Sequence, residues 1–492
     1  TTFGMTKLEA NGTKILFNNK AVKFNGILSW LGNWEQISPR YDEETFTTQI
    51  RELKKYGFNT IKFCLVVPPD YLLDICDKEG IYVYIEYPIW NPVQTDAFFE
   101  RAYSQMAELI NMAKNHPCVV MSDFNCEMPS FSDEMKDLMT WCVATGMNID
   151  SNRLFAANSS TGAQNIDGEI DFWTYHPYMN LLGFKDSARS IAESRNSGGD
   201  KPVVFGEYAD YPAFADFDKV IAANGGEIPW NWTVVDDPFR ADIYLKKLGY
   251  SDGQIKDIIE KSQQNSVEAK MWYVQETKKA DDVAAYFITI IQDIGHSVAG
   301  FFDETGDVKF DSSQTTFLKE TALLMEDTVL NYSGGVKTEV TPAVSHYSGV
   351  DLKNVSLSYS VTDSEGVKVA GGVLQSGVNI NNGQYFTFDA AELEMPQVSA
   401  AEQHKLTFEL TADGDYSTYS SWDIVVYPTA YLSASELAGK TVMVSKDSSL
   451  YNFKERYPFA TDWVDGSNPD LLVAFGSLNS SQLEYLNNGG KV

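Results

Sequence analysis

Short apolar runs alternate with amphipathic stretches from residue 24 to residue 302 of the chain. Apolar positions three or four residues apart predict helices over Asp42–Tyr56 and Pro69–Glu79, and a glycine follows each of them, as is common where a helix ends. The runs between the helices have the length and the β-branched content of buried strands. The predicted strands are 24–27, 59–66, 81–86, 118–124, 154–158, 171–175, 203–207 and 298–302, and further helices are predicted over 94–114, 132–147 and 265–294.

Alternation of strands with helices predicts a parallel sheet, and eight strands are the number that closes a (β/α)₈ TIM barrel. We therefore predict an α/β fold with a TIM-barrel domain over residues 1–334, which a hairpin over 13–25 opens. An open doubly wound sheet is the alternative. Its dinucleotide-binding form is disfavoured, because no glycine-rich phosphate turn follows the first strand. The long segment 208–297 predicts a lid or a wall of a binding site.

The pattern changes after residue 334, where apolar and polar residues begin to alternate. Val355, Leu357, Tyr359 and Val361 show this alternation, and the runs 406–410 and 422–427 repeat it. Such strands predict an antiparallel, Ig-like β-sandwich over residues 335–428. Buried-type strands at 441–444 and 471–475 and a helix at 480–487 then predict the start of an α/β domain over 429–492. The chain stops where another strand would follow, so we expect this domain to be truncated.

The amino-acid composition argues against some classes of binding partner. The formal net charge of the 492 residues is −30, which argues against a nucleic-acid partner, and no apolar run reaches the length of a membrane span. Such acidity suits a salty medium, so we expect an extracellular or periplasmic protein. The five cysteines have neither a disulfide-framework nor a zinc-site spacing, and no spaced loop of oxygen ligands for calcium is present. We therefore expect buried thiols, no metal and no cofactor.

The residues that carry chemistry stand at the ends of the predicted strands. In a TIM barrel the active site lies at the C-terminal ends of the strands. The fourth strand runs into Glu127, and the seventh ends at Glu207. Two facing carboxyl groups are what cleavage of a glycosidic bond needs, since one donates a proton to the leaving oxygen and the other attacks the anomeric carbon. Aromatic side chains beside them would stack on sugar rings.

Longer segments resemble a known group of enzymes. The segments are "NNKAVKFNGI", "LKKYGFNTIKFCLVVPPDYLLDICDKEGIYVYIEYPIW", "NHPCVVMSDFNCEM" and "DKPVVFGEYAD". They resemble the catalytic domains of clan A glycoside hydrolases over residues 14–310, most closely family 2 and its relatives. The resemblance implies that Glu127 is the general acid/base and Glu207 the nucleophile of a retaining enzyme. Their carboxyl groups would then stand about 5–5.5 Å apart.

The remaining candidates would bind the substrate. Three positions depart from the family pattern. Cys126 stands where the family has the asparagine that binds the sugar 2-hydroxyl, with Asn125 one residue earlier, and Lys62 stands where the family has an arginine. Phe301–Glu304 stands at the end of the predicted eighth strand, where the family has a tryptophan that floors the sugar site. The predicted substrate-binding residues are Asn125, Lys62, Glu86, Trp90, Trp173, His176, Tyr178, Tyr208, Trp230, Trp232 and Asp303.

The sequence thus predicts a glycosidase that cleaves β-linked glycans by double displacement, through a covalent glycosyl-enzyme on Glu207. Its partner would be an oligosaccharide or polysaccharide. The alternative is a non-catalytic carbohydrate-binding protein with the same cleft, which Cys126 and Lys62 motivate. Transglycosylation would use the same residues, and a structural ion pair between Lys62 and Glu86 competes with a role for Glu86 in substrate binding.

Overall fold

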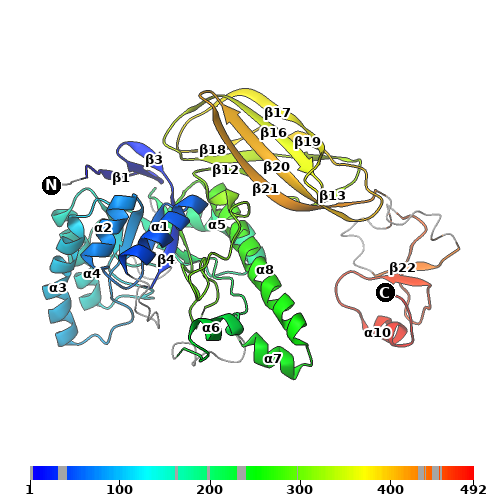
Figure 1. Ribbon diagram of the computed structural model, residues 1–492, viewed down its shortest axis with the longest axis horizontal. Helices are drawn as coiled ribbons and strands as arrows, with labels where there is room; N and C mark the ends of the chain where they lie inside the picture. Colours follow the sequence, from blue (N-terminus) through cyan, green and yellow to red (C-terminus); the bar gives the residue numbers. More distant parts are fainter. Residues whose placement is uncertain are drawn as a thin grey trace. The chain divides into compact units, whose positions relative to one another are not determined.

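A computed structural model describes residues 4–30, 42–160, 165–196, 200–229, 240–295, 297–429, 437, 439–445, 454 and 457–492 (Figure 1). They form two compact units. The first comprises residues 1–330, 338–393 and 404–423, and the second comprises 331–337, 394–403 and 424–492. The first unit joins the barrel to most of the sandwich, whereas the sequence patterns separate them at residue 334. None of the helices in the described ranges has the length and apolar character that crossing a membrane requires.

The barrel is an eight-stranded sheet with the order β8-β7-β6-β5-β4-β11-β10-β9, in which every neighbouring pair is parallel. Thr174 joins the two edge strands, because its Oγ1 donates to the carbonyl of Asn158 at 2.6 Å and accepts from the amide of Ser160 at 3.0 Å. This confirms the predicted TIM barrel. The strands are β4 (Phe24–Ser29), β5 (Thr60–Phe63), β6 (Tyr82–Glu86), β7 (Val119–Asp123), β8 (Leu154–Ala156), β9 (Trp173–Tyr175), β10 (Val203–Tyr208) and β11 (Val283–Ile288).

The prediction of the eighth strand was wrong. The strand is β11, whose six residues are all buried, and not Val298–Phe302. The helix before it, α8, spans Asp252–Lys279 and so ends well before residue 294. A strand buried on both faces is a continuous apolar run, which periodicity alone does not separate from a buried helix. Val298–Phe302 lies in the loop after β11, where Phe302 forms an isolated bridge with Gln292.

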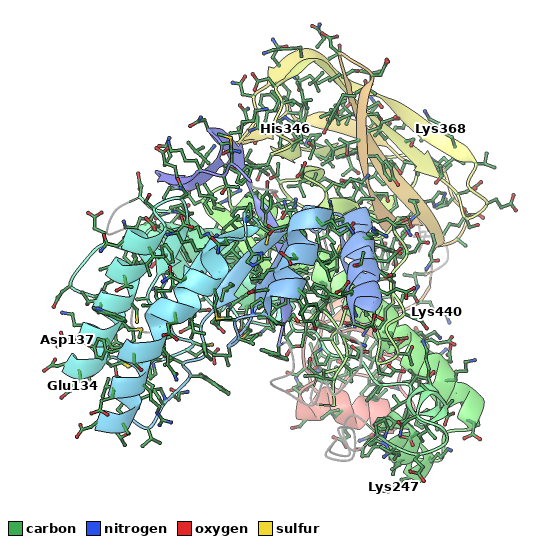
Figure 2. The ribbon with its side chains drawn as sticks, turned by 60° about the vertical axis from the view of Figure 1, so that its left-hand side comes forward. Glu134, Asp137, Lys247, His346, Lys368 and Lys440 are labelled. Atoms are coloured by element: carbon green, nitrogen blue, oxygen red, sulfur yellow. The ribbon has the colours of Figure 1, made fainter. Side chains whose placement is uncertain are left out.

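Capped helices surround the barrel. Asp42 caps α1 by accepting the amide of Thr45 at 2.8 Å, and Gly57 ends that helix at a φ of 104°, a left-handed conformation that glycine adopts at little cost. Glu134 and Asp137 mark the exposed face of α4 in Figure 2. The helices are α1 (Glu43–Tyr56), α2 (Asp70–Glu79), α3 (Asp96–Lys114), α4 (Asp133–Ile149), α5 (Leu181–Asn196), α6 (Phe217–Ala223), α7 (Ala241–Lys247) and α8.

A hairpin closes the N-terminal end of the barrel, so a functional site is expected at the C-terminal end. The antiparallel strands β1 (Leu8–Asn11), β2 (Lys14–Phe17) and β3 (Lys20–Val22) include the predicted hairpin. Leu8 and Ile15 pack in one cluster with barrel residues such as Tyr84 and Phe287. The hairpin therefore covers the N-terminal end of the barrel with apolar side chains, and the C-terminal mouth remains for chemistry.

The predicted sandwich strands are also present. The strands β21 (Tyr416–Tyr427), β20 (Glu402–Ala412), β16 (Leu352–Thr362) and β17 (Lys368–Ile380) follow one another in one sheet, and β12 (Thr321–Met325), β15 (Pro342–His346) and β18 (Gln384–Thr387) form another. Most of these residues belong to the first unit, whereas 402–403 and 424–427 belong to the second. In the second unit β22 (Val442–Val444) pairs in parallel with β23 (Thr461–Asp462) and β24 (Leu471–Val473), and α10 (Ser480–Asn487) follows them.

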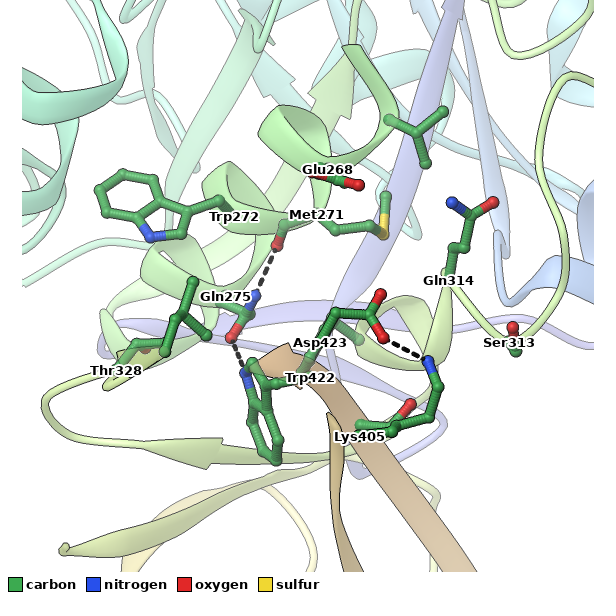
Figure 3. A pocket seen from close by; sticks show the side chains of 14 residues that line it. Glu268, Met271, Trp272, Gln275, Ser313, Gln314, Thr328, Lys405, Trp422 and Asp423 are labelled. Carbon is green, nitrogen blue, oxygen red and sulfur yellow. Dashed lines mark hydrogen bonds and ion pairs between the residues drawn. The ribbon is translucent and has the colours of Figure 1, made fainter. Parts of the chain in front are cut away.

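Trp422 of β21 holds the sandwich strands of the first unit to the barrel helix α8. Its Nε1 donates to Gln275 Oε1 at 2.7 Å, and its ring packs 5.1 Å from that of Phe408 and 5.3 Å from that of Phe317. Trp422, Gln275 and Phe317 border a pocket of about 130 Å³, which Figure 3 shows. Trp422 is 4% exposed, so its indole is part of the core of this contact.

We expect Trp422→Ala to lower the free energy of unfolding by about 3–5 kcal/mol, because the substitution opens a cavity and strands the amide of Gln275. Urea unfolding followed by tryptophan fluorescence and far-UV circular dichroism would measure this loss. Trp272→Ala is the matched control, since Trp272 borders the same pocket but is only partly buried. Equal losses in both variants would contradict the role given to Trp422.

Candidate active site

Two glutamates converge on one histidine at the C-terminal mouth of the barrel. Glu207 lies in β10 and Glu127 follows β7. His176 Nδ1 lies 3.0 Å from Glu127 Oε1 and 3.8 Å from Glu207 Oε2. One carboxylate oxygen of each glutamate and one ring nitrogen of His176 all lie within 4.8 Å of one another. The carboxyl groups of Glu127 and Glu207 therefore lie close together at the mouth.

The backbone at Glu127 is left-handed, with a φ of 52°. Such a conformation is uncommon for a residue other than glycine and needs support from its surroundings. Asn158, which follows β8, gives that support. Its Oδ1 accepts from Asn125 Nδ2 at 2.6 Å and from the amide of Met128 at 3.2 Å, and its Nδ2 donates to the carbonyl of Met128 at 3.2 Å. Asn158 therefore holds the chain on both sides of Glu127.

The surroundings of Glu207 favour its ionised form. Burial alone would raise its pKa, but His176, Lys62 and a hydrogen bond from Tyr178 outweigh burial, and the pKa of Glu207 lies below its usual value. Tyr178 OH donates to Glu207 Oε2 at 2.7 Å, and Lys62 Nζ lies 3.6 Å from Glu207 Oε1. A carboxylate held in this way is suited to act as a nucleophile.

Lys62 is fully buried and lies between two carboxylates. Its Nζ donates to Glu86 Oε1 at 2.7 Å and to Ser159 Oγ at 2.9 Å. Burial lowers the pKa of Lys62, yet Glu86 and Glu207 more than offset this, and the pKa is raised well above its usual value. The ion pair with Glu86 thus has the geometry of the structural alternative, and Lys62 also lies close enough to Glu207 to act directly on its charge.

Two thiols lie against these carboxylates. Cys64 Sγ donates to Glu86 Oε2 at 2.7 Å and lies 3.5 Å from Glu207 Oε1. Cys126 hydrogen-bonds to Cys64, and its backbone forms bridges with Trp90 and Ser159. Sequence reasoning singled out Cys126 but missed Cys64. Strand alternation could have found it, because Cys64 lies two residues after Lys62 and so points to the same side.

Asp123, the last residue of β7, is a further buried acid that sequence reasoning gave no role. Tyr84 OH donates a hydrogen bond to its Oδ2. Burial and the charge of Glu86 raise the pKa of Asp123 well above its usual value. Burial and the neighbouring Glu86 therefore favour the neutral form of Asp123, which lies beneath the mouth.

Several predicted binding residues lie away from the two glutamates. Tyr208 packs among aromatic rings, including those of Phe184 and Tyr273, because alternate residues of β10 point to opposite sides. Trp173 is the first residue of β9 and pairs with Val203, so it stands at the strand end remote from the mouth. Asp303 is ion-paired with Lys219 and accepts the amides of its own turn.

The other predictions have different outcomes. Trp90 stands at the mouth, where its backbone bridges that of Cys126, and it is 45% exposed. Asn125 is buried beside Asn158, and its Oδ1 accepts no hydrogen bond within the described part of the chain. Trp230 and Trp232 lie outside the described residues. His176, Tyr178, Lys62 and Glu86 form the immediate surroundings of Glu127 and Glu207, as described above.

The sequence of the barrel is similar to the sequences of known proteins. Residues 8–213 match the family described as glycosyl hydrolases family 2, TIM barrel domain, and this segment contains Glu127 and Glu207. Residues 337–428 match a domain of unknown function, DUF8488. A β-glucuronidase of Bacteroides fragilis is 25% identical over 146 residues, which cover 28% of this chain and 20% of that enzyme. A β-galactosidase of Pectobacterium atrosepticum is 28% identical over 131 residues, which cover 24% of this chain and 12% of that enzyme.

Solved structures support the same fold. An exo-chitosanase of Amycolatopsis orientalis superposes with a TM-score of 0.57 and 13% identity, over 86% of this chain and 51% of that one. A β-D-mannosidase of Dictyoglomus thermophilum superposes with a TM-score of 0.59 and 14% identity, over 87% of this chain and 54% of that one. The chain spans about half the length of these structural relatives. The predicted resemblance to the catalytic barrel of glycoside hydrolase family 2 is confirmed.

Proposed function

We propose that this protein is a retaining glycoside hydrolase that cleaves β-linked glycans through a covalent glycosyl-enzyme on Glu207. One observation carries the proposal. Glu127 and Glu207 converge on His176 at the mouth of a barrel that matches the family 2 TIM barrel domain. One carboxylate oxygen of each glutamate and one ring nitrogen of His176 lie within 4.8 Å of one another. Retaining enzymes need their two carboxyl groups this close, because the second carboxylate itself attacks the anomeric carbon.

The two carboxyl groups take different roles because their environments differ. Glu207 is 5% exposed and is held ionised by Lys62, Tyr178 and His176, so it attacks the anomeric carbon. Glu127 donates a proton to the leaving oxygen in the first step and accepts a proton from the attacking water in the second. Its side chain is 36% exposed, so it can exchange protons with solvent between the steps.

The proton on Glu127 depends on what fills the mouth. Without a ligand, the hydrogen bond from His176 is the main reason that the pKa of Glu127 lies below its usual value. A bound sugar excludes water from the half-exposed carboxyl and disfavours its ionised form. The negative charge of Glu207 acts in the same direction, and it is lost when the covalent bond forms. Glu127 thus holds its proton for the first step and releases it readily before the second.

We expect His176→Asn to move both limbs of the profile of kcat/KM against pH to higher values. His176 lowers the pKa of Glu127 through a hydrogen bond and that of Glu207 through its charge, so its removal raises both. Profiles measured with aryl β-glycosides would show the shift. His116→Asn is the control, since His116 is also buried and is hydrogen-bonded to a carboxylate, that of Asp77 at 3.0 Å. A profile that stays in place in His176→Asn would contradict the role of His176.

Labelling with a panel of 2-fluoro glycosides would test the function directly. Such compounds form the covalent intermediate but release it slowly, so mass spectrometry of a digest locates the adduct. We expect the adduct on Glu207, and the sugar that labels fastest identifies the preferred substrate. An adduct on another residue would overturn the assignment of roles. The relatives are named for glucuronide, galactoside, mannoside and chitosan substrates, so the panel should include all four sugar types.

A non-catalytic carbohydrate-binding protein is the second candidate. The observation that favours it is Cys126, because a thiol replaces the amide that would bind a sugar hydroxyl beside the acid/base, and a thiol is a weak donor. Isothermal titration with oligosaccharides separates the two candidates. Binding without cleavage or labelling of any glycoside would favour this second candidate.

A further inference from the structure

Four side chains at the floor of the mouth carry atoms that commonly bind metal ions, namely two cysteine sulfurs and two carboxylate oxygens. They are Cys64, Glu86, Cys126 and Glu207, and one ligand atom from each lies within 4.8 Å of the other three. All four are buried, with exposures of 1%, 0%, 3% and 5%. They come from the ends of β5, β6, β7 and β10, so the rigid barrel fixes their spacing. The cysteines are far apart in the sequence, which is why their spacing indicated no such site.

We propose that this cluster binds one thiophilic divalent ion, such as Zn²⁺ or Cd²⁺, through the two sulfur atoms and one oxygen of each glutamate. A tetrahedral ion with sulfur at about 2.3 Å and oxygen at about 2.0 Å separates these two ligand atoms by about 3.5 Å. Cys64 Sγ and Glu207 Oε1 stand 3.5 Å apart. Small side-chain rotations would bring Glu86 and Cys126 to the same ion.

The charge of the buried cluster also fits this ion. Cys64 and Cys126 are 1% and 3% exposed and lie in one cluster with the carboxylates of Glu86 and Glu207, and such surroundings favour the neutral thiol. When the ion binds, each sulfur loses its proton to solvent and forms a bond to the metal. Two positive charges enter and two protons leave, so the net charge in the low-dielectric floor does not change. Lys62 keeps its ion pair with Glu86 Oε1, while Glu86 Oε2 turns to the metal.

The donor set selects the class of ion. Thiolates favour zinc, cadmium and other soft metals, whereas calcium and magnesium need six or more oxygen or water ligands. An ion can enter from the mouth, since Glu127 beside Glu207 is 36% exposed. A metal ion bound to Glu207 would occupy the nucleophile. Loss of glycosidase activity on metal binding is therefore expected, and this consequence alone rests on the proposed function.

Cadmium binding to the reduced, metal-free protein tests the proposal without any glycoside. We expect one Cd²⁺ per chain in equilibrium dialysis and an ultraviolet sulfur-to-cadmium charge-transfer band that saturates with it. Cys64→Ala and Cys126→Ala should each weaken binding by at least about tenfold. Cys142→Ala is the matched control, because Cys142 is an equally buried thiol on α4, outside the cluster, and it should bind as the unaltered protein does. Magnesium should not compete with cadmium.

Two results would overturn the proposal. One is the absence of a stoichiometric charge-transfer band in the unaltered protein, and the other is a band that survives in Cys64→Ala/Cys126→Ala. If an alanine variant does not fold, Cys64→Ser and Cys126→Ser preserve the size and polarity of the side chains while removing the sulfur. A failure of the proposed function would give a different result from a failure of the metal proposal. The unaltered protein would then bind cadmium, but it would not cleave any glycoside and no glycoside would label it.

Discussion

Glu207→Gln is expected to lower kcat/KM for aryl β-glycosides by roughly 10⁴- to 10⁶-fold, the loss typical when a covalent nucleophile is removed. The amide keeps the size of the side chain and can still accept from Tyr178, which now lies 2.7 Å from Glu207 Oε2. What it cannot do is form the glycosyl ester. Initial rates with a substrate bearing a good leaving group, together with a check for trace contamination by native enzyme, would measure the loss.

A matched control and a chemical rescue make this result specific. Glu276 is a buried glutamate, 6% exposed and 2.7 Å from Lys279, so Glu276→Gln should change stability but not the chemical step. In Glu207→Gly, azide can enter the space left by the carboxylate and attack the anomeric carbon from the same side. We expect azide to restore turnover and to give a glycosyl azide of inverted configuration. Rescue without an azide product would argue against Glu207 as nucleophile.

Lys62→Met is expected to destabilise the protein by about 3–5 kcal/mol at neutral pH, because it leaves buried carboxylates without their counter-charge. Lys62 lies between Glu86 at 2.7 Å and Glu207 at 3.6 Å. The pKa of Glu207 is depressed in the folded state, so its ionised form stabilises the protein above the unfolded pKa of about 4.3, and that stability is lost as the pH falls through the folded pKa. The destabilisation should therefore shrink towards acid pH, where the carboxyls are protonated in the variant.

The same substitution should move the acidic limb of the kcat/KM profile to higher pH, because Lys62 is one cause of the low pKa of Glu207. Lys62→Arg keeps the charge and should restore the position of that limb. Lys279→Met is the control, since Lys279 is a buried lysine paired with Glu276 away from the mouth. It should cost stability without moving the limb. A shift of similar size in Lys279→Met would show that loss of stability, rather than local charge, moves the profile.

Periodicity in the sequence located most strands and helices, since amphipathic helices and β-branched runs differ in their repeat. It failed at β11, a doubly buried apolar strand that follows α8 closely and was included in the predicted helix 265–294. Glu127 and Glu207 were found because strand ends in a barrel share one mouth. Trp173 does not reach the mouth because it stands at the opposite end of its strand. Tyr208 does not reach it because its side chain points to the other side of the sheet, against Phe184.

Other features of the site depend on contacts between strands that no local pattern encodes. Asn158 supports Glu127 from the neighbouring strand end, and its sequence surroundings carry no signal of that contact. The pairing of Cys64 with Cys126 arises because β5, β6 and β7 are consecutive in the barrel, which brings the ends of β5 and β7 towards one floor. Spacing rules for metal sites detect ligands within one loop and so do not detect this cluster.

The pairing of β4 with β11 joins the first strand of the barrel to the last. During synthesis, β4 therefore waits for Ile288 to leave the ribosome before one of its edges finds a partner. At about 5–20 residues per second, this wait is roughly 10–50 s. An apolar strand edge exposed for that time is a template for aggregation. The yield of the protein in a host cell is thus expected to depend on the speed of translation through residues 30–288 as well as on the stability of the finished fold.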